Sequence, residues 1–400
     1  ASRLRSALLV LEVALTLALL VAGVALAASY QRLWGVSPGF APQSLVAVEL
    51  VSPTSAPRTQ AGYTAWALAH QRLRRQVLDH VRALPGVLGA TYSMAAPFHS
   101  GDRGMFAPAG EKLFTNGVLT GVPAEHLIIG PGYFATLGVP LLRGRLFTPA
   151  EIKAAADPDS KAPQPILIDS AMARRFFPGQ DPLGRQLASN LGPVVVIGVV
   201  RGTRDQDLGS TATLQAYSPD GGWPSSTFLI RTRLPLSALV PELRQAIQGT
   251  PLHMAAPVPL EQAKAKALAQ PRFRTWLMGA YAALALALSL AGLYGVLAFE
   301  VQRRRREIGV RMALGADPRA VVRLVLARGL ALVAAGAALG AFFAWLLMRA
   351  LASLLYATPA FDPIAWLPAL AALLVMLAAA GAAPALRAAR LDPAASLRCE

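Results

Sequence analysis

Apolar positions gather in four long runs along the chain, separated by segments of mixed polarity. The runs cover residues 7–29, 277–299, 330–348 and 365–386. Each has about the 17 to 25 residues that a helix needs to cross about 30 Å of hydrocarbon. Glu12 supplies the single charge within these runs. The pattern predicts a membrane protein with an α-helical four-span bundle.

The first apolar run has the position of a secretion signal but not its length. It is longer than the roughly 7 to 15 apolar residues of such signals, and no clear small-x-small cleavage site closes it. We therefore interpret residues 1–29 as a cytoplasmic start and a retained first transmembrane helix. The chain begins at Ala1 without an initiator Met, so we expect it to be a piece of a longer product.

Between the first and second spans, residues 30–274 carry strand-like and helix-like patterns in turn. Alternation at 44–50 predicts a strand, and a helix from about 62 to 84 and a second strand follow it. The same order recurs with a strand at 227–232 and a helix from about 236 to 248. Two β-α-β units that flank a long insertion predict a large α+β domain in which one split subdomain holds another.

The split subdomain would take in about 44–96 and 223–260, with the inserted mixed subdomain at about 97–222. Short strands are expected in the insertion at 165–169 and 194–200. The stretch 148–165 has few large apolar residues, so we expect it to be disordered.

The formal net charge of +16 would suggest nucleic-acid binding in a soluble protein. In a membrane protein, arginine placement instead predicts orientation, because short cytoplasmic loops are rich in Lys and Arg. Arginines precede the first span, fill the loop 300–329 and follow the fourth span, whereas the loop 349–364 has only Arg349. We therefore expect both termini and the loop 300–329 in the cytoplasm, residues 30–274 outside, and no nucleic acid as a partner.

Motifs of catalysis and cofactor binding are absent from the sequence. It contains no G-x-x-x-x-G-K-[ST] phosphate loop, no G-x-S-x-G and no H-E-x-x-H, and its five histidines are scattered. Cys399 is the single cysteine, so a disulfide or thiolate cluster within the chain is excluded. We expect no catalytic, metal or cofactor site and no ATPase activity in this chain.

Glu12 is the candidate functional residue within the spans. An ionisable side chain inside a membrane helix is a functional candidate by default. It also lies only about 10 Å above Arg5 at 1.5 Å per residue, so its carboxylate could instead reach the headgroups. Both interpretations stay open.

Small residues four positions apart form a stripe along the second span. Such a stripe lets another helix approach closely, and the third span repeats the pattern with Gly336, Gly340 and Ala344. Since we find no polar lining in the spans, we do not expect a water-filled pore or a proton relay. The predicted helix-packing stripe consists of Gly279, Ala283, Ala287, Ala291 and Gly295.

The segment after the second span combines charge with two apolar faces. Wound as a helix, residues 301–314 place Ile308 and Met312 on one side, with Val310 and Leu314 nearly opposite. Gly315 can end this helix, and Asp317 with Pro318 can begin the next. A simple stop signal needs only positive charge, so the two faces suggest contact with the bundle on one side and with a partner on the other.

Nearly the whole sequence resembles the MacB/FtsX-type permeases of ABC transporters. "LAGLYGVLAFEVQRRRREIGVRMALGADPRAVV" and "AAPALRAARLDPAASLR" are similar to their second span with the following cytoplasmic segment and to their tail. "PGYFATLGVPLLRGRLFTPAE", "ARRFFPGQDPLGRQL" and "VVVIGVVRGTRDQDLG" resemble their periplasmic core domain, in the branch of duplicated orphan permeases. The start of the chain is similar to the start of the second half of such permeases.

The resemblance implies a periplasmic core domain at 30–274 with a porter-like split subdomain, and an FtsX-like permease domain at 275–400 with a cytoplasmic tail at 387–400. It implies a multi-pass protein of the bacterial inner (plasma) membrane. Its segment 303–316 would match the coupling helix that contacts a cytoplasmic ATPase. The implied coupling residues are Arg305, Arg306, Glu307, Ile308, Gly309, Val310, Arg311, Met312, Leu314 and Gly315.

The partners implied by the resemblance are a cytoplasmic ABC ATPase, which would bind ATP and Mg, and a second permease half or a second copy. Membrane lipid and a periplasmic protein would be further partners. The function implied is transmission of ATP-driven motion to the periplasmic domain for export or extraction of a substrate. Two alternatives remain: a non-transporting subunit that regulates a periplasmic enzyme, and a passive anchored receptor, against which the coupling-like segment argues.

Overall fold

The computed structural model describes residues 2–53, 57, 59–99, 102–111, 113–115, 118–155, 163–190, 192–204, 214–222, 225–303, 318–356, 358–359 and 361–389. Two compact units divide the chain. One comprises Ala1–Gly35 with Leu268–Glu400, and the other comprises Val36–Ala267.

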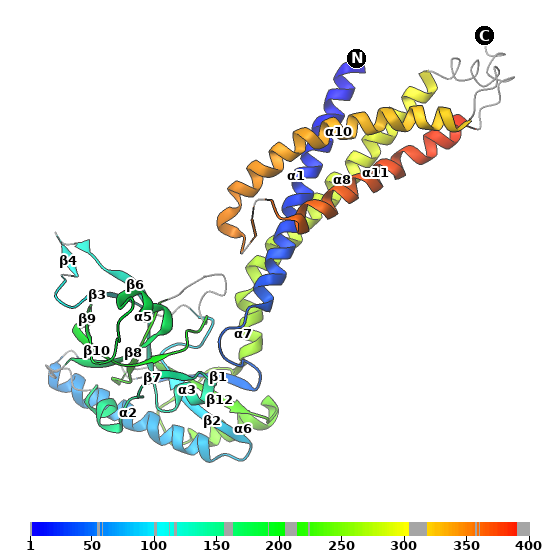
Figure 1. The fold of residues 1–400 in the computed structure, drawn as a ribbon. Helices are drawn as coiled ribbons and strands as arrows, with labels where there is room; N and C mark the ends of the chain where they lie inside the picture. The colour runs from blue at the N-terminus through cyan, green and yellow to red at the C-terminus, as the bar shows by residue number, and fades with distance from the viewer. Residues whose placement is uncertain are drawn as a thin grey trace, which may run out of the picture. The chain divides into compact units, whose positions relative to one another are not determined.

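The first unit is built from four long apolar helices and a short 3-10 turn, Ala352–Leu354 (Figure 1). Each helix is long and apolar enough to cross a membrane, which confirms the four predicted spans. The helices α1 and α8 have 34 and 35 residues, well beyond the roughly 20 that the hydrocarbon requires. The four are α1 (Ser2–Gly35), α8 (Ala269–Arg303), α10 (Pro318–Ala350) and α11 (Pro363–Ala389).

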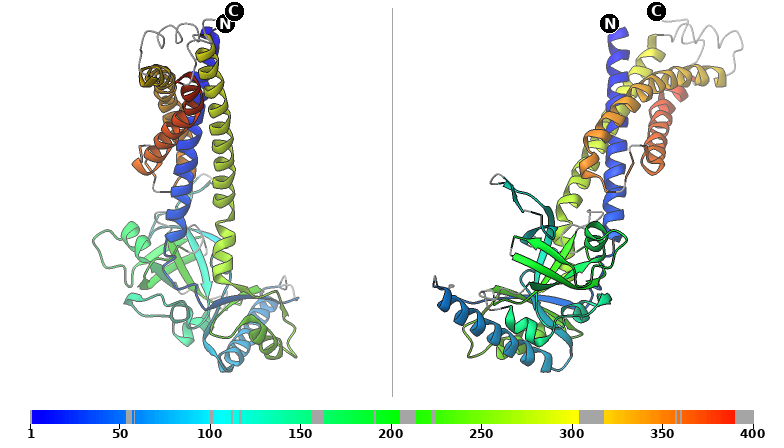
Figure 2. Two further views of the ribbon diagram at one scale, coloured as in Figure 1. Left: turned by 90° about the vertical axis from the view of Figure 1, so that its right-hand side faces the viewer. Right: turned by 60° about the vertical axis from the view of Figure 1, so that its left-hand side comes forward.

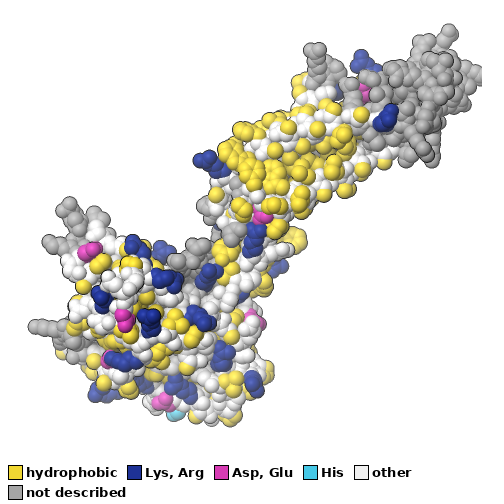
Figure 3. Space-filling view, viewed as in Figure 1, with side chains coloured by type: hydrophobic (Ala, Val, Ile, Leu, Met, Phe, Trp, Pro, Cys, Tyr) yellow, Lys and Arg dark blue, Asp and Glu magenta, His cyan; other side chains and the backbone are white. Residues whose placement is uncertain are grey.

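Helix α1 packs against all three other helices of this unit, and it lies beside α8 in both views of Figure 2. Val13, Leu17 and Val21 of α1 are fully buried in the core between the helices. The outer surface of the unit is also apolar, and hydrophobic side chains cover most of the face shown in Figure 3. A surface this apolar is expected where lipid replaces water as the solvent.

The second unit contains a 12-stranded sheet with the strand order β11-β8-β10-β9-β3-β6-β2-β12-β1-β13, to which β7 and β14 add at the side, and a separate two-stranded hairpin (β4, β5). Its strands are β1 (Leu45–Val51), β2 (Val87–Ser93), β3 (Asp102–Pro108), β4 (Phe114–Thr115), β5 (Val118–Leu119), β6 (Val122–Ile129), β7 (Leu141–Gly144), β8 (Gln164–Asp169), β9 (Gln186–Ser189), β10 (Gly192–Val200), β11 (Gln215–Pro219), β12 (Ser225–Thr232), β13 (His253–Met254) and β14 (Val258–Pro259). Its helices are α2 (Gln60–Ala83), α3 (Tyr133–Leu137), α4 (Pro149–Ala154), α5 (Ser170–Phe176), α6 (Leu236–Ala246) and α7 (Leu260–Ala267).

Strand β12 lies between β1 and β2 and pairs antiparallel with both, which is the split β-α-β arrangement that the sequence predicts. The predicted strands at 44–50 and 227–232 and both predicted helices are confirmed within a few residues. Helices α2 and α6 bury Leu78 and Leu239 against Tyr92 and Phe228 of the sheet. This apolar layer is the core of the split subdomain.

The inserted part has its own core around Phe106, Ile166 and Val196, and its predicted strands at 165–169 and 194–200 are confirmed. The expectation of disorder at 148–165 is wrong where the structure describes this stretch. Thr148 and Glu151 form a capping box that starts α4, with a proline in its first turn. The sequence T-P-A-E at 148–151 is itself a signal for the start of a helix, although the composition of the whole stretch favours disorder. Residues 156–162 lie outside the described residues.

Candidate functional site

The predicted coupling segment joins two helices that the structure does describe. The structure describes α8 as far as Arg303 and α10 from Pro318 onward. The segment between them, including Arg305 through Gly315, lies outside the described residues. Its role as a coupling helix stays a prediction.

The small-residue stripe of α8 faces away from the other helices of this chain. All five positions are exposed, and a methyl group added at Gly279 or Gly295 would meet nothing within 4 Å. The buried face of α8 carries Ala282, Ser289 and Leu293 instead. The stripe is therefore not used for packing within the described part of the chain and leaves a surface that a second helix could approach.

The matching stripe on the third span does pack within the chain, against α1. A Cβ atom on Gly336 would lie 2.7 Å from Cβ of Val13, and one on Gly340 would lie 2.8 Å from the carbonyl oxygen of Ala14. Ala344 is fully buried on the same face. The absence of side chains at the two glycines thus permits close contact between α1 and α10, as predicted for such stripes.

Glu12 lies against α8 beside two buried hydroxyl groups. The Oε2 atom of Glu12 is 2.8 Å from the position that a Cβ on Gly292 would occupy, so the glycine makes room for the carboxylate. One turn away, the hydroxyls of Thr16 and Ser289 share a 2.7 Å hydrogen bond, and Thr16 also donates to the backbone oxygen of Glu12. The expectation that the spans lack polar lining is therefore wrong at the α1–α8 contact.

An ion pair ties the end of α1 to the turn before α11. Arg32 contacts Asp362 at 2.6 Å and donates to the hydroxyl of Thr358 at 3.0 Å. Ser29 accepts a hydrogen bond from the backbone N–H of Tyr356. Asp362 also accepts from the N–H of Ile364 and so caps α11. The Arg32 hydrogen bond lowers the pKa of Asp362 below its ordinary value.

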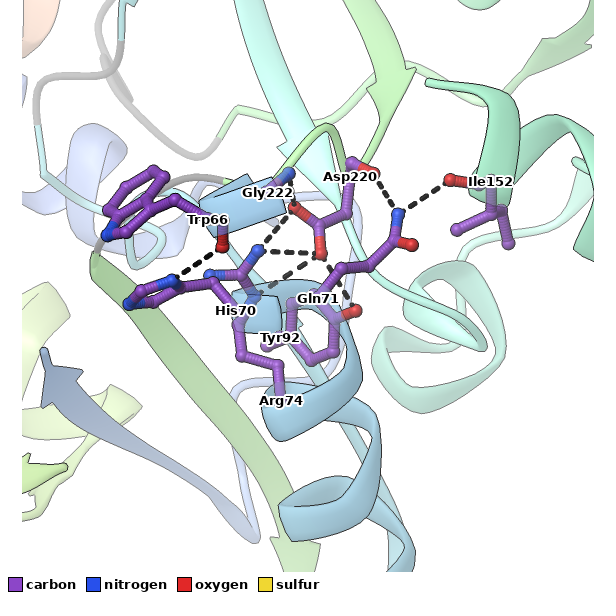
Figure 4. Close-up of polar contacts among 8 residues, drawn as sticks. All are labelled: Trp66, His70, Gln71, Arg74, Tyr92, Ile152, Asp220 and Gly222. Carbon is purple, nitrogen blue, oxygen red and sulfur yellow. Dashed lines mark hydrogen bonds and ion pairs between the residues drawn. The ribbon is translucent and has the colours of Figure 1, made fainter. Parts of the chain in front are cut away.

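In the second unit, the most buried charged pair joins α2 to the end of β11 (Figure 4). Arg74 contacts both carboxylate oxygens of Asp220 at 2.8 and 2.9 Å, and both side chains are 4% exposed. The hydroxyl of Tyr92 donates to the same carboxylate at 3.1 Å. Burial, followed by the charge of Asp220, raises the pKa of Tyr92, so its hydroxyl stays protonated and available as a donor.

Gln71, one turn before Arg74, extends this contact to the inserted part. Its side-chain amide donates to the backbone oxygens of Ile152 and Asp220, at 2.6 Å each (Figure 4). Gln71 thus holds α2 against Ile152, which is 81 positions later in the sequence. Arg74 holds α2 against Asp220, which is 146 positions later. These residues form the polar joint between the split subdomain and the insertion. Sequence reasoning missed this joint, and no local motif indicates it.

A second buried polar network lies inside the inserted part. Asp169 accepts hydrogen bonds from the N–H groups of Ala171, Met172 and Gln215, while burial raises the pKa of its carboxyl group. Gln215 also donates to Glu125 at 3.0 Å. Because each acid is fixed by donors of the fold itself, we interpret these carboxylates as structural.

Two family models match this chain. The MacB-like periplasmic core domain covers residues 6–250, and the FtsX-like permease C-terminal domain covers residues 279–393. The first match takes in the first span and most of the outer unit. The second takes in the other three spans and the predicted coupling segment.

Two curated relatives are each 27% identical to this chain over the aligned part of their sequence. The pyoverdine export ATP-binding/permease protein PvdT of Pseudomonas entomophila is 27% identical over 65% of this chain and 41% of its own length. The macrolide export ATP-binding/permease protein MacB of a Shewanella species is 27% identical over 68% and 43%. The periplasmic region of MacB from Actinobacillus actinomycetemcomitans gives a TM-score of 0.34 at 15% identity, over 56% of this chain and 94% of that one.

This chain thus spans about two fifths of the length of the curated relatives that it matches. The family matches agree with the four helices and with the α+β unit between the first and second of them. They make the chain an inner-membrane protein with a periplasmic domain. It belongs to the MacB/FtsX-type family of ABC transporter permeases.

Proposed function

We propose that the chain is the permease part of an ATP-driven exporter, which passes motion from a cytoplasmic ATPase to its periplasmic domain. The observation that carries the proposal is the pairing of α1 with α8 along two helices of 34 and 35 residues. In sequence, both helices adjoin the outer unit: α1 ends at Gly35, directly before Val36, and α8 begins at Ala269, two residues after Ala267. A continuous helix is stiff along its axis and transmits displacement better than a loop does.

The inner end of this helix pair supplies the contact for the ATPase. Helix α8 leads at Arg303 into the charged segment with two apolar faces, and α10 follows from Pro318. We assign Val310 and Leu314 to the partner-facing side. The sequence has no phosphate loop of its own, and the relatives are ATP-binding/permease proteins of more than twice the matched length. ATP and Mg would therefore bind to a separate ATPase or to another part of a longer chain.

A second permease half or a second copy would cover the exposed stripe on α8. Gly279 and Gly295 leave open space at the surface, and small residues permit close helix contact in a membrane. Cysteine substituted for Ala287, at the middle of the stripe, should cross-link two transmembrane chains. Cysteine substituted for Ala282, which is buried on the other face of the same helix, serves as the control and should cross-link less.

The coupling claim is tested by changing apolar identity while keeping charge. One variant combines Val310→Ser and Leu314→Ser and retains the four consecutive arginines at 303–306. In another, Gly315→Pro disturbs the predicted end of the helix. Both should insert normally but lose association with the ATPase. Burial of each apolar side chain contributes about 1.5 to 3 kcal/mol as an upper value, and losing half of the total for the two would already weaken association by about tenfold. Unchanged co-purification and unchanged ATP hydrolysis in both variants would contradict the proposal.

A further inference from the structure

A cavity of about 340 Å³ lies in the outer unit beside the polar joint. One wall is a single face of α2 that carries Arg75, Leu78, Asp79 and Arg82. The opposite walls come from the turn 129–134 after β6 and from the segment 146–152 that leads into α4. The volume is in the range of small-molecule sites, which begin at about 300 Å³.

The lining combines a mostly apolar surface with a few charged groups at one wall. Leu146 and Phe147 supply accessible aliphatic and aromatic surface, and Phe134 of the same lining is nearly buried. Two guanidinium groups and one carboxylate share the α2 wall, which leaves an excess of one positive charge. No ion pair joins Asp79 to Arg75 or Arg82 among the described residues. Asp79 therefore offsets only part of the positive charge of this wall.

The two arginines differ in how their donors are used. Arg82 donates to the backbone oxygens of Ala90 and Pro131, so it supports the wall itself. The Nε atom of Arg75 is buried and has no acceptor within the described part of the chain. A guanidinium donor already shielded from water, but without an acceptor, gains a hydrogen bond when a small turn of its side chain brings it to a bound anion.

We propose that this cavity binds a small anionic molecule with an apolar body, such as an aromatic or branched aliphatic carboxylate. The carboxylate pairs with Arg75, and the apolar body packs on Leu146 and Phe147. The site follows from the cavity and from Arg75, so failure of the proposed ATPase coupling would leave it standing.

The position of the cavity gives the bound molecule a structural effect. Its α2 wall belongs to the split subdomain, and its wall at 146–152 belongs to the inserted part. Gln71 already links these two parts through Ile152, which also lines the cavity. An occupant therefore adds contacts across the same boundary and stabilises the outer unit on binding.

The test measures binding of 2-naphthoate to the full chain in lipid nanodiscs by calorimetry, with empty nanodiscs subtracted. The neutral 2-naphthamide has the same body and reports the apolar contribution. Arg75→Gln should weaken 2-naphthoate binding at least tenfold and leave 2-naphthamide binding unchanged, which also shows that the variant is folded. Asp79→Asn removes a like charge and should strengthen 2-naphthoate binding.

Arg72→Gln is the matched control, since Arg72 is exposed on the same helix and does not line the cavity. It should leave 2-naphthoate binding within about twofold of the unmodified chain, because its charge is screened by salt. Three results would overturn the inference: no binding of 2-naphthoate, equal affinity for the carboxylate and the amide, or equal weakening by Arg75→Gln and Arg72→Gln.

Discussion

Arg32 and Asp362, 330 positions apart, meet at 2.6 Å and join the outer end of the first transmembrane helix to the beginning of the last. Asp362 is nearly buried, whereas Arg32 keeps about a third of its side chain exposed (30%). The carboxylate serves two donors, the guanidinium and the N–H of Ile364. Its charge and its capping role can therefore be separated by substitution.

Asp362→Asn should lower the melting temperature at neutral pH while keeping the cap, because an asparagine oxygen still accepts from Ile364. Arg32 holds the pKa of Asp362 below its ordinary value of about 3.9. A lowered pKa in the folded state gives stability that is present above the ordinary pKa and is lost as the pH falls through the folded-state value. The difference in melting temperature between the two proteins should therefore shrink below about pH 4. An equal difference at pH 7 and pH 3 would contradict the role of charge.

The buried pair of Arg74 and Asp220 should be strongly coupled in stability. Asp220→Asn leaves the guanidinium buried without its countercharge, which costs about 3 to 5 kcal/mol. Adding Arg74→Met should recover part of the loss, so the double variant should be more stable than the sum of the two single changes predicts. Denaturant unfolding of the full chain measures this, with the exposed Arg72→Met as the control. Additive losses would show that the pair is not coupled.

Two glycines of the bundle should respond in opposite directions to the same substitution. Alanine in a helix is favoured over glycine by about 1 kcal/mol, so in nanodiscs that hold a single chain Gly295→Ala, which meets nothing within 4 Å in this chain, should be neutral or stabilising. At Gly340 the new methyl group would lie 2.8 Å from the backbone oxygen of Ala14 and force α1 away. Gly340→Ala should therefore lower the melting temperature in nanodiscs. The prediction fails if both variants shift it in the same direction.

Cys399 should report the orientation of the chain because it is the sole native thiol. Arginine placement predicts a cytoplasmic C-terminus, so an impermeant thiol reagent should label Cys399 only after the inner membrane is opened. Cysteine at the exposed Gln248 of the outer unit should be labelled in intact spheroplasts as well. Labelling of Cys399 from outside would overturn the predicted topology.

The sequence predicts the four spans and the split subdomain because both depend on local periodicity. An apolar run long enough to span the hydrocarbon and an alternating strand such as 44–50 can each be recognised without knowing their partners. The stripe at Gly336 and Gly340 could be predicted for the same reason. The signals that start a helix are equally local. The capping box at Thr148 is one of them, although the composition of 148–165 as a whole favours disorder.

The polar joint could not be predicted because its members are distant in sequence and ordinary in type. Arg74 is one of three arginines close together on α2, and nothing in its surroundings distinguishes it from Arg72 or Arg75. Arg74 takes part in the joint because the sheet places Asp220 next to it. The fit of Glu12 against Gly292 is likewise a property of two packed helices.

The placement of β12 between β1 and β2 also sets an order in time. Within the described residues, the strands that pair with β1 are β12, β13 and β14, and all three are synthesised after the whole inserted part. While the chain emerges on the far side of the membrane, β1 and α2 therefore lack the strands that they pack with. The backbone of β1 is unpaired during this time, and apolar side chains of both elements are exposed. Protease resistance of the outer unit should appear only once Thr232 has been translocated. A nascent chain halted before that residue is the form most in need of a chaperone.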